Sequence, residues 1–283
     1  MRIGSTPSGT TLTALHYLQL SNALRASSAE HLASQRCILR GGDDPAGLIA
    51  AETLSSELAS VNAAQSNAAR VVGAIRVADS GMAEVGHLLN SIRGHVVEAS
   101  GGFLSDAEVA AKQIEIDAAV EAVNRISRYT TFGGRRLLDG SAEGLVLNLS
   151  PKPGETSVLN LPNVHASRLG DDVAPLNEIS SSGNLNLSHG NLSTAVRVLD
   201  AARDEILGAR AGTGAFEAHS IESGRRVLDA LEEQLTEGVS RLLDADMAEA
   251  SSRMIRAEML VEAGLAMVWT SAQSPGVIGA LLA

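Results

Sequence analysis

A heptad-like seam in the N-terminal third limits the folds open to this chain more than any other feature. Apolar residues recur at every seventh position, and a second apolar series lies beside the first. These positions are Leu54, Val61, Ala68, Ile75, Met82, Leu89 and Val96, with Val71, Ala78, Val85 and Ile92. A seam this long is typical of coiled coils, although Asp79 and Gly86 interrupt its neighbouring row. The sequence therefore predicts a long helix that packs lengthwise against other helices.

Local signals bound this helix and predict a second one. The acidic pair Asp43-Asp44 followed by Pro45 is a start signal, and Gly101-Gly102 is a stop signal. The acidic pair is better explained by helix capping than by acid chemistry. Ser105 with Glu108 three residues later reads as a capping box. The second helix is expected to run from there to about Tyr129.

The middle of the chain changes character. Leucines alternate with other residues over 145–149, a Pro/Gly turn follows, and residues 158–161 are again largely apolar. This pattern predicts a β-hairpin. Residues 162–191 are rich in Asn, Ser, Gly and Asp, and are expected to form a loop with little regular structure.

Helix is predicted again from Leu192 to the C-terminus. Gly208, Gly212 and Gly214 are expected to interrupt or loosen its first part. An apolar stripe at helical spacing follows, at Leu228, Leu231, Leu235, Val239 and Leu242. The predicted fold is mainly α, with long coiled-coil-like helices from both termini and a small β-hairpin element in the middle. Pairing the two terminal helices with each other is the economical packing.

Composition excludes several classes of function. The formal net charge of −11 disfavours binding to nucleic acid. The single cysteine, Cys37, cannot form an intramolecular disulfide and is expected to be a small buried hydrophobe. The apolar stretch 264–283 contains too many polar residues and a proline to span a bilayer, and the N-terminus lacks the apolar core of a cleaved signal peptide.

No catalytic, cofactor or metal motif is present. The chain contains no H-E-x-x-H pair, no G-x-S-x-G turn and no phosphate-binding loop. His87 and His95 are eight residues apart, too far to share a metal on one helix. We therefore expect a protein that is not an enzyme and needs no cofactor.

The predicted helices carry more apolar surface than the short middle segment of the chain can cover. Self-association would bury that surface. On pattern alone, an assembling coiled-coil protein and a self-contained helical bundle both remain open.

Several segments resemble one family when they are taken in order. The segment Leu32 to Leu48 keeps the family's Asp-Asp and Ala-Gly-Leu, although Cys37 and Leu39 replace an Arg and an Asn. The segment Tyr129 to Gly140 is similar to T-x-F-N-G-x-x-L-L-D-G, with Gly133 in place of Asn. The segment Gly154 to Val164 resembles the G-(E/D)-T…L-P-N-V hairpin of small members.

The C-terminal segments complete the resemblance. Residues 244–250 look like D-x-D-F/M-A-E, residues 263–267 look like A-G-x-A-M, and the end at 273–282 is similar to Q-x-P-Q-x-V-L-S-L-L. The joint order and spacing of these motifs identify the chain as similar to bacterial flagellins. It resembles a short, divergent member without outer surface domains.

The resemblance implies a structural subunit that self-assembles into the flagellar filament for swimming motility. It implies inner-core terminal helices at 1–42 and 247–283, an outer-core helical bundle at 43–140 and 192–246, and a hairpin and loop element at 141–191. The residues expected to carry self-assembly are Leu12, Leu15, Leu18, Leu24, Met254, Ile255, Met259, Leu260, Leu265, Val268, Ile278, Leu281 and Leu282. Asp43, Asp44 and Gly47 are expected to form the helix-start motif.

The resemblance also implies partners and a location. Besides further copies of itself, these would be the flagellar cap and hook-associated proteins and a cytoplasmic chaperone on the C-terminal helix. Export would follow the flagellar type III route without a cleaved signal, to the filament outside the cell. Neither nucleic-acid binding nor membrane insertion is expected.

Some flagellins are detected by an innate immune receptor. The positions that match its contact region here are Arg93, Gln113 and Glu115, whereas Gly94 and His95 replace the family's Glu and Leu. We therefore expect weak or absent recognition.

Two other readings compete with a filament subunit. A hook–filament junction protein shares the terminal helices, although the C-terminal motifs favour a flagellin. A non-flagellar helical binding module is the alternative from a different class.

Overall fold

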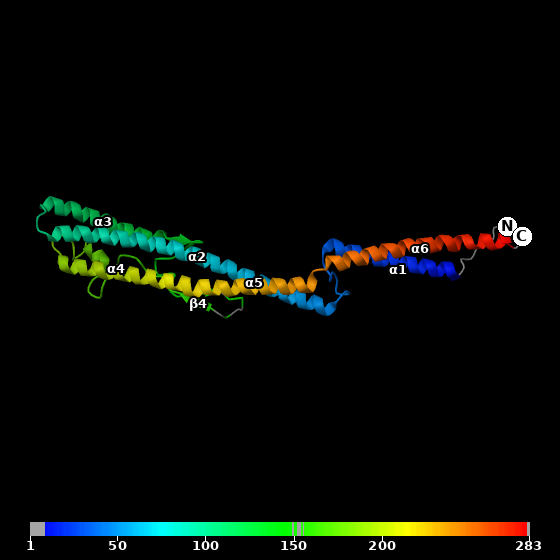
Figure 1. The fold of residues 1–283 in the computed structure, drawn as a ribbon. Helices are drawn as coiled ribbons and strands as arrows, with labels where there is room; N and C mark the ends of the chain where they lie inside the picture. Colours follow the sequence, from blue (N-terminus) through cyan, green and yellow to red (C-terminus); the bar gives the residue numbers. More distant parts are fainter. Residues whose placement is uncertain (1–8, 149, 152–153, 155, 282–283) are drawn as a thin grey trace. The chain divides into compact units, whose positions relative to one another are not determined.

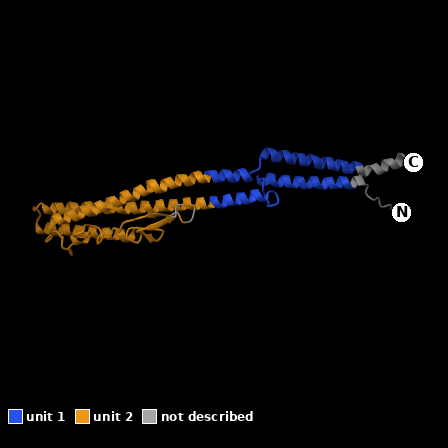
Figure 2. Cartoon of the chain, turned by 90° about the horizontal axis from the view of Figure 1, so that it is seen from below, with its two compact units in different colours: residues 1–58, 233–283 blue, residues 59–232 orange. Residues whose placement is uncertain are grey.

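The computed structural model describes residues 9–148, 150, 151, 154 and 156–281, and the side chains of 12–147, 150, 151, 154 and 156–270. Its described part is mainly helical, as predicted. The chain forms two compact units, shown in Figure 2. Unit 1 comprises residues 1–58 and 233–283, and unit 2 comprises residues 59–232.

Unit 1 consists of helices from both ends of the chain. It contains α1 (Gly9–Ser34), the start of α2 (Pro45–Ser100), the end of α5 (Glu222–Leu243) and α6 (Met247–Leu281). Figure 1 shows α1 and α6 side by side, which confirms the predicted pairing of the terminal helices.

Unit 2 packs helices around the predicted heptad seam. It contains the rest of α2, α3 (Asp106–Tyr129), α4 (Leu192–Ala215), the π-helical segment η2 (Phe216–Ile221) and the start of α5. Figure 1 shows α2, α3 and α4 running side by side. Ten of the eleven seam positions lie in unit 2, where nine are buried and Val71 is half-buried, and Leu54, in unit 1, is also half-buried.

The predicted helix boundaries are confirmed by the structure. Helix α2 begins at Pro45 and ends one residue before Gly101. The side chain of Ser105 accepts a hydrogen bond from the Glu108 amide, and the Glu108 carboxylate accepts one from the Ser105 amide. These reciprocal bonds satisfy two amides that the first turn of α3 cannot pair internally.

Asp79, which interrupts the predicted seam, contributes to packing in another way. Its carboxylate accepts hydrogen bonds from Nε and a terminal nitrogen of Arg210 at 2.7 and 3.2 Å. A two-pronged pair of this kind ties α2 to α4 and fixes their register.

The glycines that were expected to interrupt or loosen the helix after Leu192 do not interrupt it. Helix α4 continues through Gly208, Gly212 and Gly214, and the backbone changes to a π-helix only after Ala215. The helix persists because buried residues on its other face, among them Ile206 and Thr213, anchor it to the core.

Short antiparallel strands follow α3. Strands β1 (Thr131–Phe132) and β2 (Arg135–Arg136) form one pair. Strands β3 (Leu145–Asn148) and β4 (Thr156–Leu159) form the predicted hairpin, with Leu145 opposite Leu159.

The segment 160–191 has more fixed structure than predicted. It includes a 3₁₀ helix, η1 (Leu176–Ile179), and it contributes buried side chains to the core of unit 2. These buried residues are Leu161, Val164, Ala166, Leu169, Leu176, Ile179 and Leu187. The polar composition concealed this segment's apolar face, because its burial follows no helix or strand period.

Gln113 of α3 holds this segment in place. Its side chain is only 7% exposed. The amide nitrogen donates to the Ile179 carbonyl at 3.0 Å, and the amide oxygen accepts from the Leu187 amide at 2.8 Å. One side chain therefore satisfies two backbone groups that would otherwise lack partners.

Replacing Gln113 by leucine tests this role. Q113L keeps the side-chain size but leaves the Ile179 carbonyl and the Leu187 amide unpaired, so we expect the free energy of unfolding to fall by about 2–4 kcal/mol. The measurement is urea denaturation followed by circular dichroism. The neighbouring exposed side chain provides the control, since I114A is expected to change stability by less than about 0.5 kcal/mol. Equal effects of the two variants would contradict the assignment.

Candidate functional site

The paired terminal helices of unit 1 are antiparallel and are joined at one end by backbone contacts. The Cys37 amide donates to the Leu243 carbonyl at 2.7 Å, and the Ala245 amide donates to the Gln35 carbonyl at 2.9 Å. Arg36 and Asp244 form an antiparallel bridge. Residues 35–37 are thereby held beside residues 243–245, with no contribution from a disulfide.

Small residues form much of the seam between α1 and α6. On each helix, a small residue that is buried or half-buried recurs at every seventh position. These residues are Ala14, Ser21 and Ser28 on α1, and Ala250, Ala257 and Gly264 on α6. A Cβ atom added to Gly264 would lie 3.3 Å from Leu18 Cδ1 and 3.6 Å from its Cα. The small residues therefore allow the two backbones to approach closely.

Large apolar side chains lie mainly on the outer faces of the same pair. Of the residues predicted to carry self-assembly, seven are exposed and three are half-buried. The exposed ones are Leu12, Leu15, Leu24, Ile255, Met259, Leu260 and Leu265, and the half-buried ones are Leu18, Met254 and Val268. The side chains of Ile278 and Leu281, and residue Leu282, lie outside the described part of the chain.

Sequence reasoning missed five further exposed large apolar residues on these helices: Tyr17, Leu20, Met247, Met267 and Trp269. Spacing could have found them. Tyr17, Leu20 and Leu24 follow one another at steps of three and four, which places them on one stripe of α1. Trp269 is one turn beyond Leu265 on α6.

Large apolar side chains therefore remain exposed on the helix pair, among exposed polar and charged residues. Exposed apolar surface of this kind marks sites of contact with other molecules. No helix among the described residues is long and apolar enough to cross a membrane. Within the same part of the chain, no group of His, Cys, Asp and Glu could hold a metal ion. The arrangement is suited to contact with other protein surfaces.

Cys37 corrects one expectation. Its side chain is exposed, whereas the sequence reading predicted a small buried hydrophobe in a helix. The residue follows the end of α1, where its amide is committed to the Leu243 carbonyl, and its thiol donates to the Leu242 carbonyl at 3.1 Å. This backbone pairing, rather than apolar packing, fixes its position.

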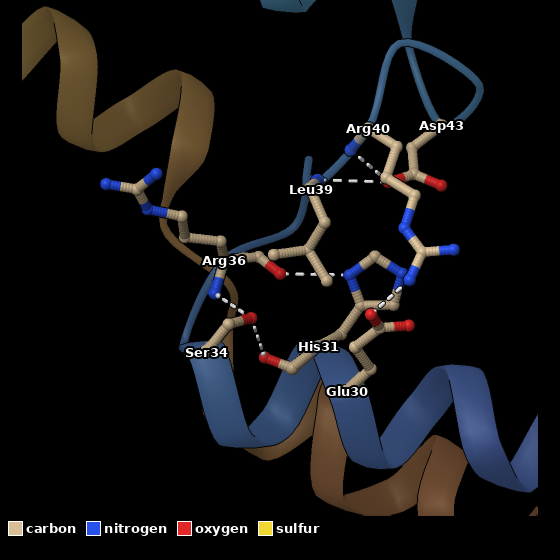
Figure 3. A network of polar contacts seen from close by, with 7 residues as sticks. All are labelled: Glu30, His31, Ser34, Arg36, Leu39, Arg40 and Asp43. Atoms are coloured by element: carbon tan, nitrogen blue, oxygen red, sulfur yellow. Dashed lines mark hydrogen bonds and ion pairs between the residues drawn. The ribbon is translucent and has the colours of Figure 1, made fainter.

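The helix-start motif organises the connection between α1 and α2, as Figure 3 shows in part. Asp43 accepts hydrogen bonds from the amides of Leu39 and Arg40 at 3.0 and 2.9 Å. Asp44 accepts from the amide of Ala46 at 3.1 Å, in the first turn of α2. Only Asp44 therefore bonds to the first turn of α2, whereas Asp43 satisfies amides of the preceding loop.

Side chains from the end of α1 complete this network (Figure 3). Arg40 forms an ion pair with Glu30, and Nδ1 of His31 lies 3.0 Å from the Arg36 carbonyl. The backbone of Leu39, rather than its side chain, makes the polar contact in this loop.

Gly47 is required by close packing. A Cβ atom there would lie 2.4 Å from Asp44 Oδ2 and 2.7 Å from Ile38 Cδ1. Ile38 belongs to a small buried cluster with Ala51 and Leu243. The side chain of Asp44 could move, but that of Ile38 has little room.

The three receptor-patch equivalents have different environments in unit 2. Arg93 Nε donates to Asp200 Oδ1 at 3.0 Å, so this guanidinium ties α2 to α4. Gln113 is buried and holds segment 160–191. Glu115 lies 3.3 Å from His95 Nε2 and 3.4 Å from Lys112 Nζ. Each of these side chains is engaged within the unit.

Paired terminal helices that expose large apolar side chains, in a mainly helical chain, are features of a structural subunit that associates with other protein surfaces. Comparisons with known proteins agree. Residues 8–143 match the bacterial flagellin N-terminal helical region, and residues 196–278 match the bacterial flagellin C-terminal helical region. The chain belongs to the bacterial flagellin family, and it is a structural subunit of the flagellar filament.

Relatives cover nearly the whole chain. A flagellin of Bacillus subtilis is 26% identical over 288 residues, which is 93% of this chain and 94% of the relative. A flagellin of Halalkalibacterium halodurans is 28% identical, over 89% and 90% of the two chains. The flagellin FlaB2 of Treponema pallidum is 27% identical, over 89% and 90%.

A solved structure of a putative flagellar hook-associated protein from Vibrio parahaemolyticus is also similar. It matches 84% of this chain and 99% of that chain, with 16% identity and a TM-score of 0.42. At this level the match gives no information on function.

Substituting Gly47 tests the helix-start packing. G47A is expected to reduce stability by about 1–3 kcal/mol, because the added methyl group displaces Ile38 from its cluster. Gly42 offers a matched control, since a Cβ atom there would have no neighbour within 4 Å. Hydrogen exchange of residues 38–51 should become faster in G47A and stay unchanged in G42A. Faster exchange in neither variant would show that the loop absorbs the methyl group.

Asp43 should make the α1–α2 connection sensitive to acid. The Leu39 and Arg40 amides, in that order, lower the pKa of Asp43 below its ordinary value of 3.8. A lowered folded-state pKa stabilises the fold at any pH above the unfolded-state value, and this contribution is lost as pH falls through the folded-state pKa. We expect the Leu39 and Arg40 amides to exchange slowly at pH 5 and to lose protection below about pH 3.8.

The D43N variant is the control for this titration, because its side chain does not ionise in this range. Its amide protection should vary little between pH 5 and pH 3 after correction for intrinsic exchange. A wild-type chain whose protection is equally flat would contradict the role of the Asp43 carboxylate.

Proposed function

We propose that the terminal helices are the inner layer of the filament. Residues 1–42 and 247–283 form this layer, residues 43–140 and 192–246 form an outer-core bundle, and residues 141–191 add the hairpin and loop element. The observation that carries the proposal is the exposure of large apolar side chains on the outer faces of α1 and α6. These faces become buried when further copies pack around the pair.

The distribution of side-chain sizes suggests that α1 and α6 pair within one chain first, and that further copies then pack around the pair. Small residues let α1 and α6 pair closely within one chain, so the pair itself covers few of the large side chains. Burying one large apolar side chain is worth about 1.5–3 kcal/mol. Adding copies is therefore the step that buries most of the large apolar side chains of α1 and α6. The predicted self-assembly residues are the ones that this step buries.

The same exposed helix faces suit the proposed partners. A cytoplasmic export chaperone would cover the C-terminal helix α6 before export, since an uncovered apolar helix favours aggregation. The flagellar cap and hook-associated proteins would contact the two ends of the polymer. The chain would leave the cell by the flagellar type III route and reside in the filament outside the cell.

Recognition by the innate immune receptor is proposed to be weak. Gln113 is buried, so it is not free to contact a receptor, and Arg93 and Glu115 are engaged with neighbouring side chains. A receptor reporter assay giving full potency for the monomer would refute this proposal.

Charging the outer face of α6 tests the assembly role. I255D/M259D is expected to abolish elongation of filament seeds, because each carboxylate would be buried without a partner when copies pack. The monomer should keep its helical content, since both side chains are already exposed. Electron microscopy and sedimentation of seeded protein are the measurements.

An exposed valine on a loop of unit 2 supplies the control. V173D makes the same kind of change at a similarly exposed position outside the terminal helices, and this variant should still elongate seeds. Normal filaments from I255D/M259D would overturn the assembly role of this face.

A further inference from the structure

Unit 2 carries a basic surface that neither the helix packing nor the proposed terminal contacts use. Residues 122–138 contain four arginines and no acidic residue, although the whole chain has a net charge of −11. Arg125 and Arg128 lie near the end of α3, and Arg135 and Arg136 form β2, which packs against α3. We call these four side chains the arginine patch.

Neighbouring carboxylates neutralise only part of the arginine patch. Arg128 pairs with Glu121 at 2.8 Å, and Arg136 pairs with Asp139 at 3.6 Å. Arg135 donates to the Ser141 carbonyl at 3.5 Å and forms no ion pair with the residues that the structure describes, so its charge stays in place. Arg125 is exposed and forms no ion pair with any residue that the structure describes. The patch therefore keeps a net positive charge at the surface.

An apolar side chain lies beside one member of the arginine patch. Phe132 pairs with Arg135 across the β1–β2 ladder, and its ring lies against α2, where a Cβ atom added to Gly73 would be 3.1 Å from it. The ring remains partly exposed. Arginine and aromatic side chains are both enriched at protein interfaces.

The complementary charge lies on α5. Residues 227–240 contain four carboxylates and no basic residue. Asp229 and Glu232 accept hydrogen bonds from Gln65 at 2.9 and 2.8 Å. Glu233 and Glu237 are exposed, one turn apart on the same face of the helix. We call these last two the acidic pair.

The acidic pair is also poorly neutralised within the chain. Glu237 is paired with Arg241 at 2.5 Å, and Glu233 has no ion pair within the described residues. Like charges four residues apart destabilise a helix on its own. An external cationic partner would remove this repulsion.

We propose that the arginine patch of one copy binds the acidic pair of a second copy in the filament. The two surfaces differ and belong to the same sequence, so the contact is heterologous and can repeat from copy to copy without closing, as an open polymer requires. Opposite charges also select the register in which copies meet and raise the rate of productive encounter. This contact lies outside the terminal helices, so it adds a specificity-determining surface to the apolar assembly proposed above.

Charge reversal at either surface tests the contact in the full chain. R135E/R136E and E233R/E237R are each expected to raise the critical concentration for elongation of wild-type seeds by at least about tenfold, because like charges would then face each other. Circular dichroism should show unchanged helical content, since all four side chains are exposed. Normal elongation by folded R135E/R136E would overturn the proposal.

Combining the reversals distinguishes a contact from two separate defects. A chain carrying all four substitutions regains opposite charges at the interface, so self-seeded elongation should return to within about threefold of wild type. If the quadruple variant folds but elongates seeds no better than the two double variants, the arginine patch and the acidic pair do not meet.

The chain offers a second arginine pair as a matched control. Arg225 and Arg226 are exposed on α5, and R225E/R226E changes the net charge by the same amount as R135E/R136E. This control is expected to elongate seeds like wild type. An equal loss in the control would show that net charge, rather than the arginine patch, limits assembly. Wild-type protein is elongated in the same assay. If wild type elongates seeds and R135E/R136E does so equally well, the arginine-patch proposal fails while the proposed role of the terminal helices stands.

Discussion

Close approach of α1 and α6 is the constraint on which the rest of the arrangement depends. Small residues at every seventh position let the two backbones meet, and the large apolar side chains are consequently left on the outside of the pair. Apolar burial within one chain is therefore incomplete by construction. Unit 2, by contrast, buries its heptad seam and its irregular segment within itself. The proposed assembly would complete the apolar burial of unit 1 through further copies.

Patterns local in sequence predicted much of this fold. The seam from Leu54 to Val96, the capping box at Ser105 and the β3–β4 hairpin are confirmed, because each depends on residues close together along the chain. The contact of Asp44 with the first turn of α2 is local in the same way, whereas Asp43 bonds to the loop that precedes it. The outward orientation of the predicted self-assembly residues could not be predicted, because it depends on which side of each helix faces the other terminus.

Interactions between distant residues account for what sequence reasoning missed. Segment 160–191 reads as a loop because its burial has no period, and its order depends on Gln113. Asp79 reads as a flaw in the seam until Arg210 is placed opposite it. Cys37 reads as a buried hydrophobe until the bridge between Arg36 and Asp244 places it at the surface. In each case the deciding partner is remote along the chain.

The position of Trp269 gives the chain an optical property. It is the only tryptophan in the sequence, and it is 64% exposed on α6. Indole emission depends on the polarity around the ring, so the fluorescence of the whole chain reports on the environment of one helix. The spectrum of a solution of monomers would therefore move to shorter wavelength as neighbouring copies exclude water from that ring, without any added label.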